Sequence, residues 1–302
     1  MHKSCEAEFR QESEHFLAQT EAYVSTMRTY GQQVLIPCKS GQQAAYYHRG
    51  SALNAPTVFE IHGGCFSQGT AANDDEMRQA FCAYTGFHVI GLGYRKSTHS
   101  SFPAALEDIY DEINYFVNHA AQYGIDTSKL AVWGHSAGGN LAFQAVWMGQ
   151  KSKKYGINLL MLDYPYLDLY TEGNKRSQTS DGLTAERLDA MRNVYAPNID
   201  RKLFWISPIF ASDEILAALP PVSMTLCGYD PLQKEGVDML KRLLYNGVPV
   251  TAKLYTGMEH GFVELWYFRE WYMKNTHISK QMEESAQDAL EFQALSALRY
   301  LK

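Results

Sequence analysis

Short apolar runs alternate with amphipathic stretches along most of the chain, beginning near residue 56. The runs have the length of buried strands and occupy 57–62, 88–94, 130–134, 158–164, 222–227 and 250–255. Between them, apolar residues recur at helical spacing near 75–85, 103–123, 138–150 and 232–246. This alternation predicts βαβ units, and therefore an α/β fold with a mostly parallel sheet and helices on both faces.

Three regions depart from this alternation. Residues 33–37 and 44–48 flank Ser40-Gly41, which predicts an antiparallel hairpin at the sheet edge. The first 30 or so residues look helical and polar, and residues 166–205 interrupt the rhythm with a predicted helix over 184–195. We expect 1–30 and 166–205 to form a helical cap over the carboxyl edge of the sheet, where open α/β sheets bind ligands, within one domain spanning 1–302.

Composition excludes several classes of protein. The chain has 302 residues, 46% of them hydrophobic, and a net charge of −6, so it is folded and is not expected to bind nucleic acid. No apolar stretch reaches the roughly 18 residues of a membrane-spanning helix. Five scattered cysteines without CxxC spacing indicate neither a disulfide framework nor a zinc site. The charged first residues do not resemble a secretory signal, and we expect a cytoplasmic location.

The segment Gly134-His135-Ser136-Ala137-Gly138 lies between a predicted strand and a predicted helix. A G-x-S-x-G segment in this setting forms a sharp elbow that exposes its serine, and the glycines let the backbone turn tightly. The helix that follows directs its first N–H groups at the reacting centre. We therefore predict that Ser136 is a nucleophile, the alternative being a Gly/Ser-rich turn that caps a helix.

A second glycine-rich turn, His62-Gly63-Gly64-Cys65-Phe66, closes the first predicted buried strand. Adjacent glycines allow backbone N–H groups to face an anion, and hydrolysis of a carbonyl compound needs such donors where the oxyanion develops. We assign the N–H groups of Gly64, Cys65 and Ala137 to this oxyanion hole, with Gly63 permitting the turn. Alone this could be a plain glycine turn, but its place upstream of the serine elbow favours the functional interpretation.

Two further residues follow predicted strands. His260 comes after the last strand and is predicted to act as the base for Ser136. Asp230 comes after the strand over 222–227 and is predicted to orient the histidine and stabilise its imidazolium form. An Asp before Pro is also a common turn residue, and three other acids compete for the same role: Glu235, Asp163 and Asp168.

Together these motifs resemble the hormone-sensitive-lipase branch of the α/β-hydrolases, also called the α/β-hydrolase fold-3 family. The matching segments are HGGCF at 62–66, GHSAGGN at 134–140, DPLQKEG at 230–236 and HGF at 260–262, with YR at 94–95 and FPAALED at 102–108. The resemblance covers about residues 56–262. It implies the α/β-hydrolase fold with a helical cap, and serine-dependent hydrolysis of short-chain carboxylic esters.

The sequence departs from the family at several positions. Cys65 stands where the family has a third glycine, so the oxyanion hole is expected to persist if φ at Cys65 is negative, with the thiol as a small filler beside the site. His135 stands where the family frequently has Asp, and we expect a structural role. The aromatic stretch 262–272 is open to pocket lining, core packing or a dimer face, of which the last two together are favoured.

The resulting prediction is a serine carboxylesterase that uses neither a metal nor an organic cofactor. It would hydrolyse acetyl to butyryl-like esters of small soluble alcohols, aryl alcohols or sugars through an acyl-enzyme. Related arylformamidases also carry a bulkier residue after HGG, so an amidase or formamidase with the same triad is an alternative. A catalytically silent binding protein is a further alternative. The expected partner is a small-molecule ester, without nucleic acid or membrane, and a homodimer would be unsurprising.

Overall fold

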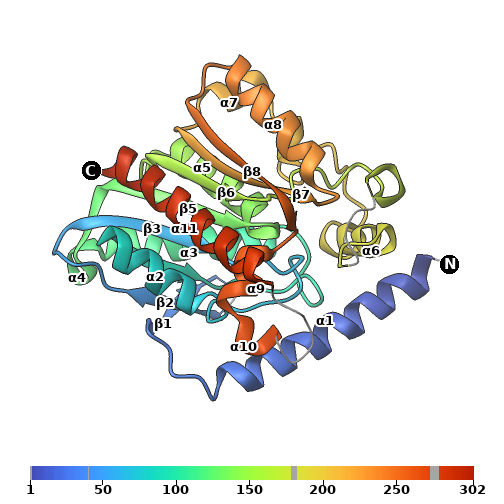
Figure 1. Cartoon of the computed structure of the whole chain (residues 1–302), viewed down its shortest axis with the longest axis horizontal. Coiled ribbons are helices and arrows are strands. Elements are labelled where there is room, and N and C mark those ends of the chain that lie inside the picture. Colours follow the sequence, from blue (N-terminus) through green and yellow to red (C-terminus); the bar gives the residue numbers. More distant parts are fainter. Residues whose placement is uncertain (1, 40, 178–181, 273–278) are drawn as a thin grey trace.

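A central eight-stranded sheet runs through the computed structural model, which describes residues 2–39, 41–177, 182–272 and 279–302 (Figure 1). The strands are β1 (Gln32–Cys38), β2 (Gly41–His48), β3 (Ala55–Ile61), β4 (His88–Leu92), β5 (Ile125–His135), β6 (Leu159–Asp163), β7 (Val222–Tyr229) and β8 (Val250–Glu259). They lie in the order β1-β2-β4-β3-β5-β6-β7-β8. The pairs β1–β2 and β2–β4 are antiparallel and the other pairs are parallel. The predicted edge hairpin is confirmed, although Ser40 itself lies outside the described residues.

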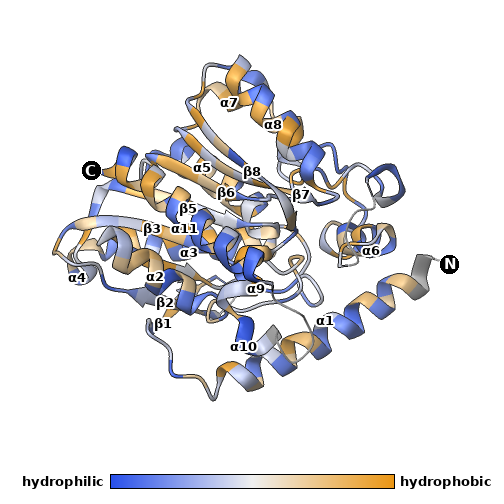
Figure 2. Cartoon of the chain, in the orientation of Figure 1, coloured by the Kyte–Doolittle hydropathy of each residue, from blue (hydrophilic) through white to orange (hydrophobic). Residues whose placement is uncertain are grey.

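Successive residues of the central strands face two different hydrophobic cores. On β5, Val132 belongs to one core, whereas Ala131 and Trp133 belong to the other. On β3 the same alternation separates Phe59 from Val58. Because helices cover both faces, the central strands are mainly apolar, which is why the sequence marks them as apolar runs with few interruptions (Figure 2).

The two faces of the sheet carry different helices. One core is closed by α3 (Ala104–Asn118), α5 (Ala137–Ser152) and α8 (Gln233–Tyr245), and the other by α2 (Asp75–Thr85) and α11 (Lys280–Leu301). The first four had been predicted, except that the 103–123 segment divides into α3 and a short α4 (Ala120–Tyr123). Helix α11 was not among the predicted elements, and it places Ala286, Ala289 and Leu290 in the second core. Smaller elements are α7 (Asp213–Ala217) and the 3₁₀ turns Gly173–Lys175 and Pro208–Phe210.

Two helices outside these layers occupy the segments that we interpret as a cap. The long helix α1 (His2–Val24) lies against α6 (Ala185–Tyr195) at the right of Figure 1. Asn193 Nδ2 of α6 donates to Glu6 Oε1 of α1 at 2.8 Å. α6 begins after Thr184, whose hydroxyl accepts a hydrogen bond from the helix, as its predicted start requires. Residues 178–181 of the predicted 166–205 insertion lie outside the described residues.

The aromatic stretch 262–272 forms two short helices, α9 (Phe262–Tyr267) and α10 (Arg269–Tyr272). Most of its buried aromatic residues pack into the core beneath them, as Phe262 does. Trp271 instead lies with its ring centroid 5.2 Å from that of Tyr23 on α1. The stretch therefore serves mainly for packing and holds α1 in place, while its Glu264 and Leu265 line the pocket described below.

Two further findings concern the whole described chain. Within the described residues, no helix is both long and apolar enough to cross a membrane. All five cysteines are described, and each is a free thiol.

Candidate active site

Ser136 lies in the tight turn between β5 and α5 with φ 53° and ψ −116°. This is a strained backbone conformation for a residue other than glycine, and such strain is typical of catalytic elbows. The glycines on either side are required by close contacts. A Cβ at Gly134 would lie 2.2 Å from the Gly138 carbonyl oxygen, and a Cβ at Gly138 would lie 2.0 Å from the Ile61 carbonyl oxygen. The elbow therefore forms as the G-x-S-x-G pattern predicts.

Three of the predicted residues form one chain of hydrogen bonds. His260 Nε2 lies 2.7 Å from Ser136 Oγ, and His260 Nδ1 lies 2.8 Å from Asp230 Oδ2. The other carboxylate oxygen of Asp230 accepts the Leu232 N–H at 2.8 Å, which fixes the acid in place. Residues that are far apart in sequence thus meet at the carboxyl ends of β5, β7 and β8, at the distances that proton transfer requires.

The environment of His260 suits a base that works near neutral pH. Burial lowers the pKa of His260, but the Asp230 carboxylate outweighs burial, so that the pKa is raised above its ordinary value. The imidazole is only 11% exposed, so its proton exchanges mainly with the pocket and with Ser136.

The three competing acids have other functions in the structure. Asp163 accepts hydrogen bonds from Trp133 Nε1 at 2.6 Å and Gln293 Nε2 at 2.6 Å. Asp168 accepts the backbone N–H groups of the turn that follows it. Glu235 forms an ion pair with Arg176 and accepts the Leu167 N–H. None of these three carboxylates forms a hydrogen bond or ion pair with His260, whereas Asp230 does.

The glycine turn after β3 lies beside Ser136, because a Cβ at Gly63 would lie 3.5 Å from the Ser136 Cβ. Its carbonyl groups are engaged elsewhere. The Tyr94 hydroxyl donates to the carbonyls of His62 and Gly63 at 3.1 Å, and the Gly64 carbonyl accepts the Gln68 N–H at 2.7 Å. Within the described part of the chain, no protein acceptor is recorded for the N–H groups of Gly64, Cys65 and Ala137. These donors are therefore available to an external anion.

One expectation about this turn is wrong. The φ angle at Cys65 is +60°, not negative, and Phe66 also has φ +60°. Two consecutive left-handed residues other than glycine cost energy, which the buried packing of Phe66 against Tyr195 helps to offset, with ring centroids 3.7 Å apart. The N–H of Cys65 is available in this conformation as well, so the requirement for a negative φ was too strict.

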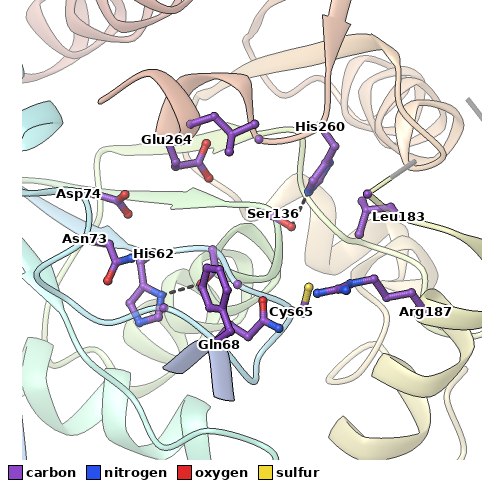
Figure 3. A pocket seen from close by; sticks show the side chains of 17 residues that line it. His62, Cys65, Gln68, Asn73, Asp74, Ser136, Leu183, Arg187, His260 and Glu264 are labelled. Carbon is purple, nitrogen blue, oxygen red and sulfur yellow. Dashed lines mark hydrogen bonds between the residues drawn. The ribbon is translucent and has the colours of Figure 1, made fainter. Parts of the chain in front are cut away.

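A pocket of about 300 Å³ opens in front of Ser136 and His260 (Figure 3). The glycine turn, including Gly63, Gly64 and Cys65, forms part of its wall. Cys65 is half-buried and points its sulfur into the pocket beside Arg187, as expected of a side chain that narrows the site. Burial raises the pKa of the Cys65 thiol, so the thiol is uncharged at neutral pH.

His135 has the predicted structural role, but it lies in an ionic cluster that the sequence did not indicate. Its ring nitrogens lie 3.1 Å from Asp163 and 3.5 Å from Glu60. Neither contact has the geometry of a hydrogen bond, so the attraction between His135 and the two carboxylates is mainly ionic. Burial alone would lower the pKa of His135, but the carboxylates of Glu264 and Asp163 outweigh it and raise the pKa to about 10. His135 is therefore an imidazolium at neutral pH.

Three other pocket residues, Asp74, Glu264 and Arg187, were also missed. Glu264 comes just after the HGF motif, and a charged side chain in that aromatic stretch could have been noticed. Asp74 and Arg187 carry no motif signal, because only the fold brings the residue before α2 and the first turn of α6 to the pocket.

Known proteins that resemble this chain are α/β hydrolases and esterases. A profile of the alpha/beta hydrolase fold family matches residues 58–264. The acetyl esterase of Salmonella dublin is 29% identical over 233 residues, which cover 76% of this chain and 72% of that protein. The structure of an esterase from the archaeon Pyrobaculum calidifontis matches 98% of this chain and 92% of its own, with a TM-score of 0.77 and 27% identity.

A carboxyl esterase from the fungus Tuber melanosporum shares the fold, with a TM-score of 0.80 at 22% identity, over 92% of this chain and 89% of its own. Because the family profile spans more than half of the sequence, the chain belongs to the alpha/beta hydrolase fold family, as its motifs indicated. Within that family it is a carboxylic ester hydrolase of the serine type.

Proposed function

We propose that the protein hydrolyses short-chain esters, from acetyl to butyryl, of small alcohols, aryl alcohols or sugars through an acyl-enzyme on Ser136. The observation that carries the proposal is the continuous hydrogen-bond chain from Ser136 through His260 to Asp230, at the mouth of a small pocket. A cavity of about 300 Å³ is at the lower end of the range for ligand sites, which favours a small acyl or alcohol group. The acetyl esterase relatives support the same choice.

In the proposed mechanism, His260 Nε2 takes the proton of Ser136 Oγ as the oxygen attacks the ester carbonyl. The N–H groups of Gly64, Cys65 and Ala137 hold the oxyanion, with Gly63 leaving room beside the serine. His260 then gives its proton to the departing alcohol, and Asp230 stabilises the imidazolium in the interval. Water releases the acyl group by the same steps in reverse order. This chemistry needs neither a metal nor an organic cofactor.

The expected partner of the protein is therefore a small ester. A reducing compartment such as the cytoplasm remains our proposal for its location, supported by the five free thiols.

Hydrolysis of p-nitrophenyl acetate, butyrate, octanoate and laurate tests this proposal, with Ser136→Ala as the matched control. We expect kcat/KM to fall as the acyl chain lengthens, and Ser136→Ala to abolish turnover of every ester. Equal or rising activity toward laurate would contradict the short-chain assignment. No turnover of any ester by folded protein would instead favour an amide or formamide substrate or a silent binding protein.

A further inference from the structure

One wall of the pocket is acidic. Asp74, from the loop that leads into α2, and Glu264, from α9, both line the cavity. Figure 3 shows the two carboxylates on the same side of Ser136, both directed into the open space, with Arg187 and Leu183 on the opposite side. The pocket is thus polarised, with negative charge at one end and a guanidinium at the other.

Asp74 is buried, and its carboxylate accepts no hydrogen bond from the part of the chain that the structure describes. Its residue is 3% exposed, and it stands at the N-cap position of α2 without making a cap hydrogen bond. Across the described residues, no side-chain or backbone donor is recorded for this carboxylate. Leaving a buried carboxylate unpaired is costly. Because this carboxylate points into the pocket, we expect a bound ligand to supply its hydrogen-bond donor.

The cations behind this wall are already occupied by other acids. Arg78 Nη1 donates to Glu60 at 2.7 Å. His135 lies between Glu60 and Asp163 at ion-pair distance. The nearby carboxylate of Asp75 is paired with His48 at 3.0 Å. With these pairs formed, no cation of the described residues lies at ion-pair distance from Asp74 or Glu264.

One oxygen of Glu264 accepts the Tyr164 hydroxyl. Among the described residues no cation lies at ion-pair distance from Glu264, although its charge acts on the buried His135 imidazolium. Burial, followed by the carboxylates of Glu60 and Glu264, raises the pKa of Asp74 to about 8. A positively charged group in the pocket would offset the repulsion between these carboxylates, and it would supply the hydrogen-bond donor that Asp74 lacks.

We propose that the pocket selects esters that carry a positively charged nitrogen, with the ammonium group bound between Asp74 and Glu264 while the ester carbonyl lies at Ser136. Arg187 at the other end repels the cation and so fixes the direction in which the substrate enters. This inference deepens the proposed esterase function and rests on it, since it names the chemical class of ester.

Matched pairs of esters test this selectivity directly at pH 7. One pair places the charge on the alcohol, with 2-(dimethylamino)ethyl acetate against 3-methylbutyl acetate, which has the same skeleton without the nitrogen. The other places it on the acyl group, with ethyl 4-(dimethylamino)butanoate against ethyl 5-methylhexanoate. We expect the kcat/KM of the charged ester to exceed that of its neutral partner about tenfold or more in at least one pair.

Two variants locate the cause. Asp74→Asn should lower the ratio of charged to neutral kcat/KM about tenfold, and Glu264→Gln should lower it as well. Because the two variants test the same ammonium site independently, a folding defect in one of them would not leave the proposal untested. The matched control is Glu76→Gln, which removes a carboxylate two residues after Asp74. Glu76 lies outside the pocket, where it forms an ion pair with Arg269 at 3.2 Å. This control should leave the ratio unchanged.

Each outcome bears on the proposal. A ratio near one in both pairs, with the neutral esters hydrolysed, overturns the selectivity and leaves the esterase function intact. A high ratio that survives in both Asp74→Asn and Glu264→Gln also overturns it. If the protein hydrolyses neither these esters nor p-nitrophenyl acetate, the proposed function fails and the inference fails with it.

Discussion

Two histidines near the nucleophile each face carboxylates, but in different surroundings. His260, the hydrogen-bond partner of Ser136, has one carboxylate, Asp230, at 2.8 Å and keeps an edge toward the pocket. His135, the sequence neighbour of Ser136, is completely buried, with Asp163 at 3.1 Å and a second carboxylate at 3.5 Å.

The difference shows how the same pair of groups can serve chemistry or structure. Asp230, with further contributions from Glu264 and Glu235, raises the pKa of His260 but leaves it able to lose and regain a proton. Several carboxylates around a buried ring raise the pKa of His135 to about 10, so its charge is fixed at neutral pH. Complete burial between two carboxylates fixes the charge of His135, whereas access to the pocket lets His260 exchange its proton with Ser136, as the proposed base must.

The largest expected effect comes from removing the base. His260→Ala should lower kcat/KM for p-nitrophenyl butyrate by about 10⁴-fold, because Ser136 then has no proton acceptor. The unfolding transition in urea should change little, since the ring borders the cavity. If the variant kept activity within about tenfold of the wild type, Ser136 would not depend on this histidine.

The next largest effect concerns stability and separates the two histidines. His135→Leu should lower the free energy of unfolding by about 3 to 5 kcal/mol, because it leaves Asp163 buried without its imidazolium and Glu60 with Arg78 alone. Urea unfolding monitored by fluorescence measures this loss. The control is His99→Leu, an exposed position, which should change stability by less than about 0.5 kcal/mol. An unchanged stability in His135→Leu would mean that the cluster does not hold a charged imidazole.

Much of this picture could be predicted from the sequence, because it is local. The elbow at 134–138, the glycine turn at 62–66 and the strands and helices between them have short-range signals in glycine placement and apolar periodicity. The boundaries shifted by a few residues, as in β5, which begins at Ile125 and extends well before the predicted run.

The charged cluster could not be predicted, because it depends on strand register. His135 lies opposite Asp163 in the pairing of β5 with β6, and Asp163 lies opposite Thr225 in the pairing of β6 with β7. In the sequence His135 and Asp163 are single polar residues near the end of an apolar run, and Thr225 lies within one. The left-handed backbone at Cys65 and the approach of Asp74 to the pocket likewise depend on tertiary contacts that no motif encodes.

The smallest effect is a shift in the pH dependence of activity. His260 accepts a proton only when it is neutral, so kcat/KM falls as the pH drops through its pKa, which lies above the ordinary 6.5. Asp230 is the main cause of this raised pKa, and the Glu264 carboxylate adds to it. Glu264→Gln removes one of these charges, which makes the imidazolium less stable and lowers the pKa. The acid limb of kcat/KM should therefore move to lower pH, by less than about one unit.

A neutral ester such as p-nitrophenyl acetate is the appropriate substrate for this measurement, because its charge does not change between pH 5 and 8. Glu76→Gln serves again as the control, since its carboxylate faces Arg269 rather than His260 and should leave the limb in place. If the acid limb of kcat/KM moved to higher pH in Glu264→Gln, or moved equally in both variants, Glu264 would not act on His260 through its charge. A limb that moves only in Glu264→Gln would place this acid in electrostatic contact with the base as well as on the pocket wall.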